Sequence, residues 1–269
     1  MKIIRVTVGA AICGVVAVVL GCANLQGGFS ATNGKGDIVT DSDESEFRRR
    51  ARIRLELASG YFEQGQTNVA LDEIKQALTA DPGFADAYNL RGLIYMRLSN
   101  FALSEDSFKR ALNLNPRDAS VAHNYGWLMC QQSRYPEALQ FFKQALSNPT
   151  YGGQAKTLMT QGVCQLRAGQ RTDAELSLTR SYELDSGNPL TGYNLANVLF
   201  ARGELTRSQF YIRRLNSGDL ANAETLWLGA KIELGLKNNA AVQQLGSQLK
   251  KRFPESREAA AFDKGSFNE

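Results

Sequence analysis

A single histidine, His123, is the only imidazole in this chain of 269 residues. Neither a two-histidine zinc site nor an iron site of two histidines and one carboxylate can be built from one imidazole. A catalytic triad needs partner groups beside the histidine, and the sequence places no base or nucleophile next to His123. We therefore expect that the chain is not an enzyme and has no catalytic residue, metal or cofactor, and we interpret His123 as a polar residue of a binding groove.

The four cysteines are the other candidates for chemistry. Cys13 lies in an apolar N-terminal run and Cys22 follows that run, which leaves Cys130 and Cys164 in the body of the chain. No CxxC pair is present, so a metal or redox motif has no support. Cys130 and Cys164 could form a disulfide only if their Cα atoms came within about 7 Å. Because they hold non-equivalent places in the repeat described below, and because cysteine is often buried, the sequence favours buried free thiols.

The N-terminus has the order of a secretion signal. Lys2 and Arg5 precede an apolar run that ends at Leu20 and is shorter than the roughly 20 residues of a membrane-spanning helix. The sequence Val19-Leu20-Gly21-Cys22 resembles a bacterial lipobox, whose cysteine becomes the lipid-modified first residue of the mature protein. Residues 1–21 are therefore predicted to be a lipoprotein signal peptide and Cys22 the lipidation site. An uncleaved anchor or an ordinary signal peptide is the alternative.

The segment after Cys22 is predicted to be a tether. Residues 22–50 form the lipidated N-terminus and a flexible linker, because Gly, Ser, Thr, Asn and Asp are frequent there and large apolar residues are few. Ala23 stands where enterobacterial sorting, by resemblance, uses aspartate to retain a lipoprotein in the inner membrane. We therefore expect the periplasmic face of the outer membrane as the location.

Composition limits the choice of partner. The chain has 43% hydrophobic and 22% charged residues and a formal net charge of +4. This balance suits a globular protein with a sizeable core, and no stretch gathers Lys, Arg and aromatic residues on one face. Nucleic-acid binding is therefore not expected.

From residue 51 the sequence repeats with a period near 34 residues. Each unit contains a small residue, followed twelve residues later by a second one. The spacings between the first small residues are 34, 34, 36, 34 and 33, which defines six units. The first set is Ala58, Gly92, Gly126, Gly162, Ala196 and Gly229, and the second set is Ala70, Ser104, Ala138, Ala174, Ser208 and Ala241.

This pattern resembles the tetratricopeptide repeat. Two short antiparallel helices pack closely only where both present small side chains, and a single hairpin cannot bury its apolar face without a stacked neighbour. We predict an all-α, right-handed superhelical solenoid over residues 51–254, followed by a C-terminal tail over residues 255–269. The predicted repeats are 51–84, 85–118, 119–154, 155–188, 189–221 and 222–254.

The first helices of such a solenoid line a concave groove that binds partner segments. Trp127 is the predicted anchor, because tryptophan is frequent among interface hot spots. The alternative is that Trp127 and Met96 only pack between repeats. By resemblance, the groove positions of the second and third units are Asn89, Leu93, Met96, His123, Trp127 and Cys130, with Arg97 and Gln131 at the edge.

Two asparagines have a specific role by resemblance. Asn124 and Asn194 hold the sixth position of their repeats, where related peptide-binding proteins hydrogen-bond a ligand backbone. Lys156 and Arg97 stand in different repeats, without the pattern of a clamp for a C-terminal carboxylate. The predicted protein-binding residues are thus Asn89, Leu93, Met96, His123, Asn124 and Trp127.

The combination of a lipobox, a short polar tether and six repeats resembles the type IV pilus biogenesis lipoproteins of the PilW or PilF type. The central segments His123-Asn124-Tyr125-Gly126 and Asn148-Pro149-Thr150-Tyr151, with the longer 36-residue spacing between Gly126 and Gly162, add to this likeness. The resemblance implies a monomeric outer-membrane pilotin that binds secretin subunits, promotes their multimerisation and so supports twitching motility. A periplasmic repeat scaffold for cell-wall or outer-membrane assembly machinery is the alternative.

Overall fold

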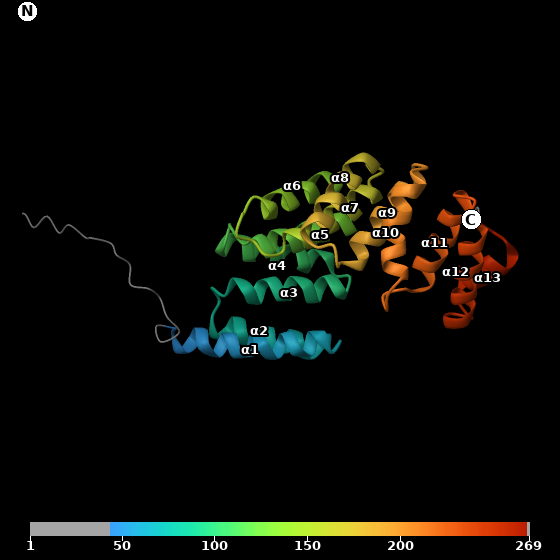
Figure 1. The fold of residues 1–269 in the computed structure, drawn as a ribbon. Coiled ribbons are helices and arrows are strands. Elements are labelled where there is room, and N and C mark those ends of the chain that lie inside the picture. Colours follow the sequence, from blue (N-terminus) through green and yellow to red (C-terminus); the bar gives the residue numbers. More distant parts are fainter. Residues whose placement is uncertain (1–43, 268–269) are drawn as a thin grey trace, which may run out of the picture. The chain divides into compact units, whose positions relative to one another are not determined.

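The computed structural model describes residues 44–267, which belong to one compact unit. Every regular element in this part is an α-helix, and consecutive helices pair as hairpins (Figure 1). None of these helices is both long and apolar enough to cross a bilayer. The pairs are α1 (Glu46–Glu63) with α2 (Thr67–Ala80), α3 (Ala85–Arg97) with α4 (Phe101–Leu114), α5 (Ala119–Gln131) with α6 (Tyr135–Leu146), α7 (Gln154–Arg167) with α8 (Arg171–Leu184), α9 (Pro189–Ala201) with α10 (Leu205–Asn216), and α11 (Ala223–Gly235) with α12 (Asn239–Arg252), before a final α13 (Arg257–Lys264).

The small residues of each hairpin lie where its two helices cross. A β-carbon added at Gly92 of α3 would lie 2.5 Å from the ring of Phe108 on α4. A β-carbon at Gly126 of α5 would lie 2.9 Å from the ring of Phe142 on α6. Glycine is therefore required at these crossings, because a phenyl ring fills the space that a side chain would need.

Serine replaces alanine at two of the crossings because a backbone carbonyl accepts its hydroxyl proton. Ser104 Oγ donates to the Gly92 carbonyl at 2.8 Å, and Ser208 Oγ donates to the Ala196 carbonyl at 2.6 Å. Both hydroxyls are fully buried, so these hydrogen bonds offset the cost of removing them from water.

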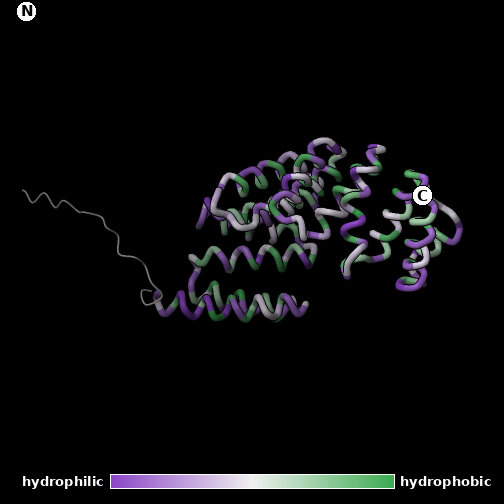
Figure 2. Tube along the Cα trace, in the orientation of Figure 1, coloured by the Kyte–Doolittle hydropathy of each residue, from purple (hydrophilic) through white to green (hydrophobic). Residues whose placement is uncertain are grey.

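Neighbouring hairpins stack mainly through the second helix of one and the first helix of the next, and also through their first helices. Each of α1, α3, α5, α7 and α9 approaches the next first helix directly, whereas no two second helices of the described residues come within 8 Å between Cα atoms. Hydrophobic and hydrophilic residues alternate along the helices, so each one buries a stripe (Figure 2). The core is therefore a continuous series of clusters along the stack rather than one centre.

The turn inside each hairpin requires one residue in the left-handed conformation. Gly65, Gly169 and Gly203 take it with φ between 75° and 78°. Ser99 and Ser133 occupy the same place with φ of 58° and 60°. A left-handed φ costs a residue with a β-carbon more than it costs glycine, so the turns of the second and third units are strained.

The equivalent residue of the last hairpin is Lys237, with φ of 59°, and it corrects the predicted register of the sixth unit. In the other units this residue follows the first small residue by seven positions, which selects Ala230 instead of Gly229. Ala230 is fully buried, and Val242, twelve residues later, is buried as well, whereas Ala241 is only partly buried. The last spacing is therefore 34 residues rather than 33, and the adjacent Gly and Ala made the sequence ambiguous.

Helix α1 begins earlier than predicted. It starts at Glu46, inside the range 22–50 assigned to the tether, and Ser45 caps it by accepting a hydrogen bond from the Arg48 amide at 3.1 Å. A serine N-cap followed by a glutamate in the first turn stabilises a helix start. The rest of the predicted tether, with Cys22 and the signal peptide, lies outside the described residues.

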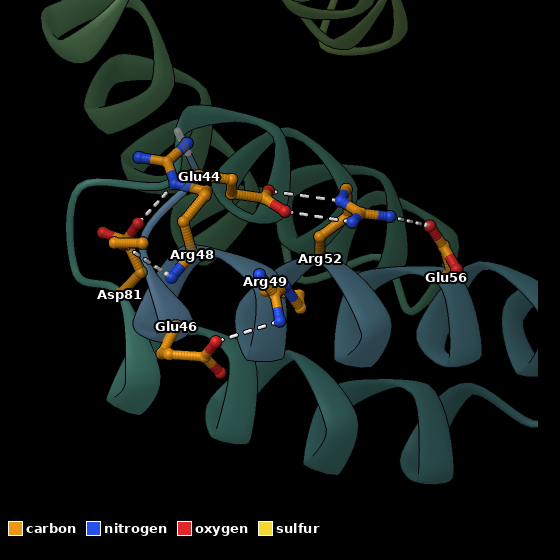
Figure 3. Close-up of polar contacts among 8 residues, drawn as sticks. Glu44, Glu46, Arg48, Arg49, Arg52, Glu56 and Asp81 are labelled. Carbon is orange, nitrogen blue, oxygen red and sulfur yellow. Dashed lines mark hydrogen bonds and ion pairs between the residues drawn. The ribbon is translucent and has the colours of Figure 1, made fainter. Parts of the chain in front are cut away.

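The arginines at the start of α1 are paired with carboxylates (Figure 3). Arg52 contacts Glu44 at 3.0 Å and Glu56 at 3.2 Å, and Arg48 pairs with Asp81 in the loop that precedes α3. Exposed pairs of this kind contribute little individually. Together with Arg49, which pairs with Glu46, these arginines are therefore largely neutralised by carboxylates of α1 and of the segments beside it.

The predicted C-terminal tail contains a separate helix, α13. Ser256 caps it, and its Phe262 lies over Gly246 of α12, where an added β-carbon would be 1.9 Å from the ring. Trp227 and Phe267 join this cluster, with ring centroids 4.9 Å apart. A solenoid end needs such a cover because no further repeat packs against it.

Candidate functional site

A groove of about 460 Å³ lies on the first helices of the second to fifth units. Five of the six predicted protein-binding residues line it, and Asn89 contacts one of these five instead of lining the groove. Their role in binding stays a prediction. The lining residues are Leu93 and Met96 of α3, His123, Asn124 and Trp127 of α5, Lys156, Met159, Thr160 and Val163 of α7, and Leu190 and Asn194 of α9.

Trp127 is a wall of the groove and also part of the core. Its indole is partly buried and packs against the cluster around Phe142, together with Leu93 and Met96. The guanidinium carbon of Arg167, at the end of α7, lies 4.8 Å from the indole centroid. Trp127 therefore lines the groove and also packs between repeats. The guanidinium over the ring holds the indole in place.

His123 forms part of the groove floor. It is 5% exposed, and its Nδ1 lies 2.9 Å from Thr157 Oγ1 on α7. Burial, and secondarily the positive charge of Lys156, lowers the pKa of His123 to about 4. The imidazole is therefore neutral at neutral pH and links α5 to α7 by a hydrogen bond. No cluster of metal-ligating side chains is found among residues 44–267.

The asparagines of the groove keep one hydrogen-bonding group available. Asn124 Nδ2 donates to Asn89 Oδ1 at 3.0 Å, and Asn194 Nδ2 donates to the Leu190 carbonyl at 2.8 Å. These bonds fix both amide planes, and neither Oδ1 atom receives a donor from the described part of the chain. Each oxygen can thus accept a backbone N–H from a bound segment, since a carboxamide oxygen has two lone pairs.

Cys130 and Cys164 form a disulfide, which overturns the expectation of free thiols. Their Cα atoms are 5.8 Å apart, and the bridge joins α5 to α7 behind the groove wall. Cys130 follows Gly126 by four residues, and Cys164 follows Gly162 by two. Two residues correspond to about 200° around a helix, so the cysteines lie on opposite faces of their helices. Two parallel neighbouring helices contact each other through opposite faces. The two cysteines can therefore meet because they hold different positions in their repeats, which the sequence analysis had taken as an argument against a disulfide.

The charge of the groove is positive. Lys156 is the charged residue of the lining, and no carboxylate lines the groove within residues 44–267. Arg97, predicted at the edge, instead packs over the Phe62 ring at 3.9 Å and donates to the Phe62 carbonyl at 2.6 Å. The groove therefore suits a neutral or acidic segment with apolar side chains.

Comparisons with known proteins identify the repeat and the family. A tetratricopeptide-repeat family model matches residues 83–150. The type IV pilus assembly protein PilF of Pseudomonas aeruginosa is 27% identical over 87% of this chain and 92% of its own length. PilW, a widely conserved type IV pilus biogenesis factor, is 30% identical to this chain in sequence. Its crystal structure superposes with a TM-score of 0.72 over 78% of this chain and 97% of the PilW chain. This chain belongs to the PilW and PilF family.

The structure of P. aeruginosa PilF shows the same fold, with a TM-score of 0.75 over 82% of this chain and all of PilF. The predicted resemblance to the PilW and PilF family and the predicted all-α repeat solenoid are therefore confirmed. The chain is a tetratricopeptide-repeat protein of type IV pilus biogenesis, and repeats of this class act as scaffolds that bind protein partners.

Part of the groove in this PilW and PilF family member was not predicted from the sequence. Met159, Thr160 and Val163 of α7 hold the same positions, relative to Gly162, as His123, Asn124 and Trp127 hold relative to Gly126. Applying the same repeat positions to the fourth unit would have predicted these three residues. Leu190 lies one turn nearer the start of α9 and needed the structure.

Proposed function

We propose that this chain is a pilotin, an outer-membrane lipoprotein anchored through Cys22 that binds secretin subunits of the type IV pilus and promotes their localisation and multimerisation. The observation that carries the proposal is the groove of α3, α5, α7 and α9 in a member of the PilW and PilF family. Its apolar walls and its two asparagine oxygens suit an extended or helical protein segment.

The disulfide supports a periplasmic location for this function. Disulfides persist in oxidising compartments such as the bacterial periplasm and are rare in the cytosol. The bridge between Cys130 and Cys164 fixes α5 against α7, so two of the four groove helices are positioned before a partner binds. A preorganised groove loses less conformational entropy on binding.

Anchoring and binding act together in this proposal. A lipid on Cys22 restricts the protein to one membrane surface, and bacterial lipoproteins carry more than one acyl chain, which makes the attachment durable. Secretin subunits held in the groove are then concentrated at the surface where the ring assembles. The higher local concentration favours multimers without any new contact between subunits.

The test of function measures SDS-resistant secretin multimers in outer-membrane fractions of wild type, a deletion strain and a Cys22→Ala strain. We expect loss of multimers on deletion, and reduced or mislocalised multimers without the anchor. Normal multimers in the deletion strain would contradict the pilotin function and leave a repeat scaffold with another client.

The test of the site measures binding of purified secretin to groove variants. Trp127→Ala and Leu93→Asp should each weaken binding about tenfold or more, because they remove an aromatic anchor or bury a charge in the groove. Leu103→Asp, on the exposed side of α4 in the same repeat as Leu93, is the matched control and should bind normally. Unchanged binding by folded groove variants would place the site elsewhere.

A further inference from the structure

The second helices of the fourth and fifth units carry exposed apolar side chains at the same repeat position. Leu176 of α8 is 63% exposed and Phe210 of α10 is 62% exposed. Each follows the first small residue of its unit, Gly162 or Ala196, by fourteen residues. The position faces solvent in both helices, so neither side chain contributes to the core of the solenoid.

The other four units have polar residues at this position. All four are exposed, and two of them are carboxylates. The repeat therefore folds with a polar residue here, and the apolar area of Leu176 and Phe210 is not explained by folding. The four residues are Asp72, Asp106, Gln140 and Gln244.

Contacts between α8 and α10 hold the two apolar residues on adjoining surfaces. Glu175, next to Leu176, pairs with Arg207 of α10 at 3.0 Å. The Tyr182 and Tyr211 rings pack edge to face across the same two helices, with centroids 4.9 Å apart. Tyr211 also supports the Phe210 ring, at 5.1 Å between centroids. The backbones of α8 and α10, like those of the other second helices in the described part of the chain, do not come within 8 Å between Cα atoms. These side chains span the space between the two helices.

Two arginines lie one helical turn beyond the apolar residues. Arg180 follows Leu176 and Arg214 follows Phe210 by four residues, so each shares a helix face with its apolar neighbour. Both are exposed, and neither has a carboxylate within 4.0 Å in the described part of the chain. By contrast, Arg213 is paired with the buried Glu233 at 2.7 Å. Arg180 and Arg214 are therefore available to an anionic partner.

Carboxylates also border this surface: Glu204, at the start of α10, pairs with Arg207, and two more lie on α8. Asp173 and Glu183 lie on the same side of that helix as Leu176, and both are exposed. The corresponding positions on α10 are Arg207 and Ser217. Because Arg207 is itself paired with Glu175 and Glu204, the unpaired positive charge of this surface comes from Arg180 and Arg214.

We propose that Leu176, Phe210, Arg180 and Arg214 form a docking surface, here called the convex patch, for an acidic protein segment. Apolar side chains of the partner cover Leu176 and Phe210, and its carboxylates pair with the two arginines. The convex patch is formed by second helices and is separate from the groove, so a pilotin could hold a second protein while the groove is occupied.

The charges favour an acidic protein over the other occupants. A second copy of this chain, docked through the same patch, would bring four unpaired arginines into one interface, whereas an acidic segment brings carboxylates without further cations. A lipid surface would meet only two unpaired cations, each contributing about 1 kcal/mol at an anionic membrane. An acidic protein segment with apolar residues matches both the arginines and the exposed leucine and phenylalanine.

The test places the photoreactive residue p-benzoylphenylalanine at Phe210 of the full-length protein in cells, with the same replacement at Gln140 as the matched position in the third unit. We expect an adduct with one other protein at Phe210 and not at Gln140. The cross-linked peptide, identified by mass spectrometry, should carry Asp or Glu beside apolar residues.

Charge variants make the test specific. Arg180→Glu combined with Arg214→Glu should lower the adduct yield at least tenfold, and Arg110→Glu, at the same repeat position in the second unit, should not. Replacing the partner's cross-linked carboxylate with lysine should restore the yield with the double variant. An adduct with a second copy of this chain or with lipid would overturn the proposal, as would a yield that is equal at Gln140 or insensitive to the double variant.

Discussion

The boundary between the third and fourth units is closed by a covalent bond, whereas the C-terminal end is closed by a short helix. At the boundary, the Cys130–Cys164 bridge and the His123–Thr157 hydrogen bond join α5 to α7 directly under the groove. At the end, Phe262 of α13 packs over Gly246, beyond the last repeat. The C-terminal end is thus covered by packing alone, whereas the helices that form the centre of the groove are also joined covalently.

Removing a phenyl ring should destabilise the central region much more than the C-terminal end. Phe142 is fully buried against Gly126, and Phe142→Ala should lower the free energy of unfolding by about 4 kcal/mol. Phe262 is only partly buried, so Phe262→Ala should cost about half as much. Urea unfolding followed by circular dichroism measures both. Equal losses would mean that the end is as tightly coupled to the core as the centre.

Loss of the disulfide tests the central boundary alone. The double variant Cys130→Ala, Cys164→Ala should lose about 3 kcal/mol of stability, because the bridge restricts the unfolded chain. Wild-type protein in reductant is the control and should lose a similar amount, while the double variant should not respond to reductant. A wild-type midpoint that reductant leaves unchanged would contradict a structural role for the bridge.

The buried histidine should make the central boundary sensitive to acid. The pKa of His123 is lowered to about 4 from an ordinary value near 6.5, so the unfolded chain binds more protons between these two pH values. Its contribution to stability is complete above pH 6.5 and decreases as the pH falls, by about 1.5 kcal/mol between pH 6.5 and 5. Urea unfolding at both pH values measures the loss. His123→Gln should show a smaller dependence over this range, and an unchanged dependence would assign it to other groups.

The smallest expected effect is a gain at the turns. Lys237→Gly in the last hairpin should raise the free energy of unfolding by about 1 kcal/mol, because glycine adopts a positive φ without strain. Ser133→Gly makes the same change in the central region. Thermal unfolding of both variants should show similar gains. A gain at Ser133 alone would indicate that the last hairpin unfolds independently of the centre.

The hairpins and most of the groove could be predicted from the sequence. Spacing alone located the crossings at Gly92 and Gly126, because close helix packing tolerates few residue types. The groove residues of the second and third units followed from their places in the same repeat. Local rules of this kind recur in every unit, so six copies reinforce one another.

Other features depended on orientation and on single contacts. Predicting the disulfide required knowledge of which faces of α5 and α7 meet. The prediction of free thiols was wrong because it assumed that bridged cysteines would hold equivalent positions in their repeats. The sixth unit offered two adjacent small residues, Gly229 and Ala230, and the turn at Lys237 together with the burial of Val242 decides for Ala230. Phe262, which packs on Gly246, lies beyond the last repeat, so the repeat pattern could not predict this contact.

The disulfide also determines where the solenoid can bend. With Cys130 bonded to Cys164, movement of the third unit against the fourth is restricted where α5 and α7 meet. The first helices on either side, α3 and α9, contact α5 and α7 without a covalent bond. We therefore expect the groove to be least restrained at its two edges, at Leu93 and Met96 of α3 on one side and at Leu190 and Asn194 of α9 on the other.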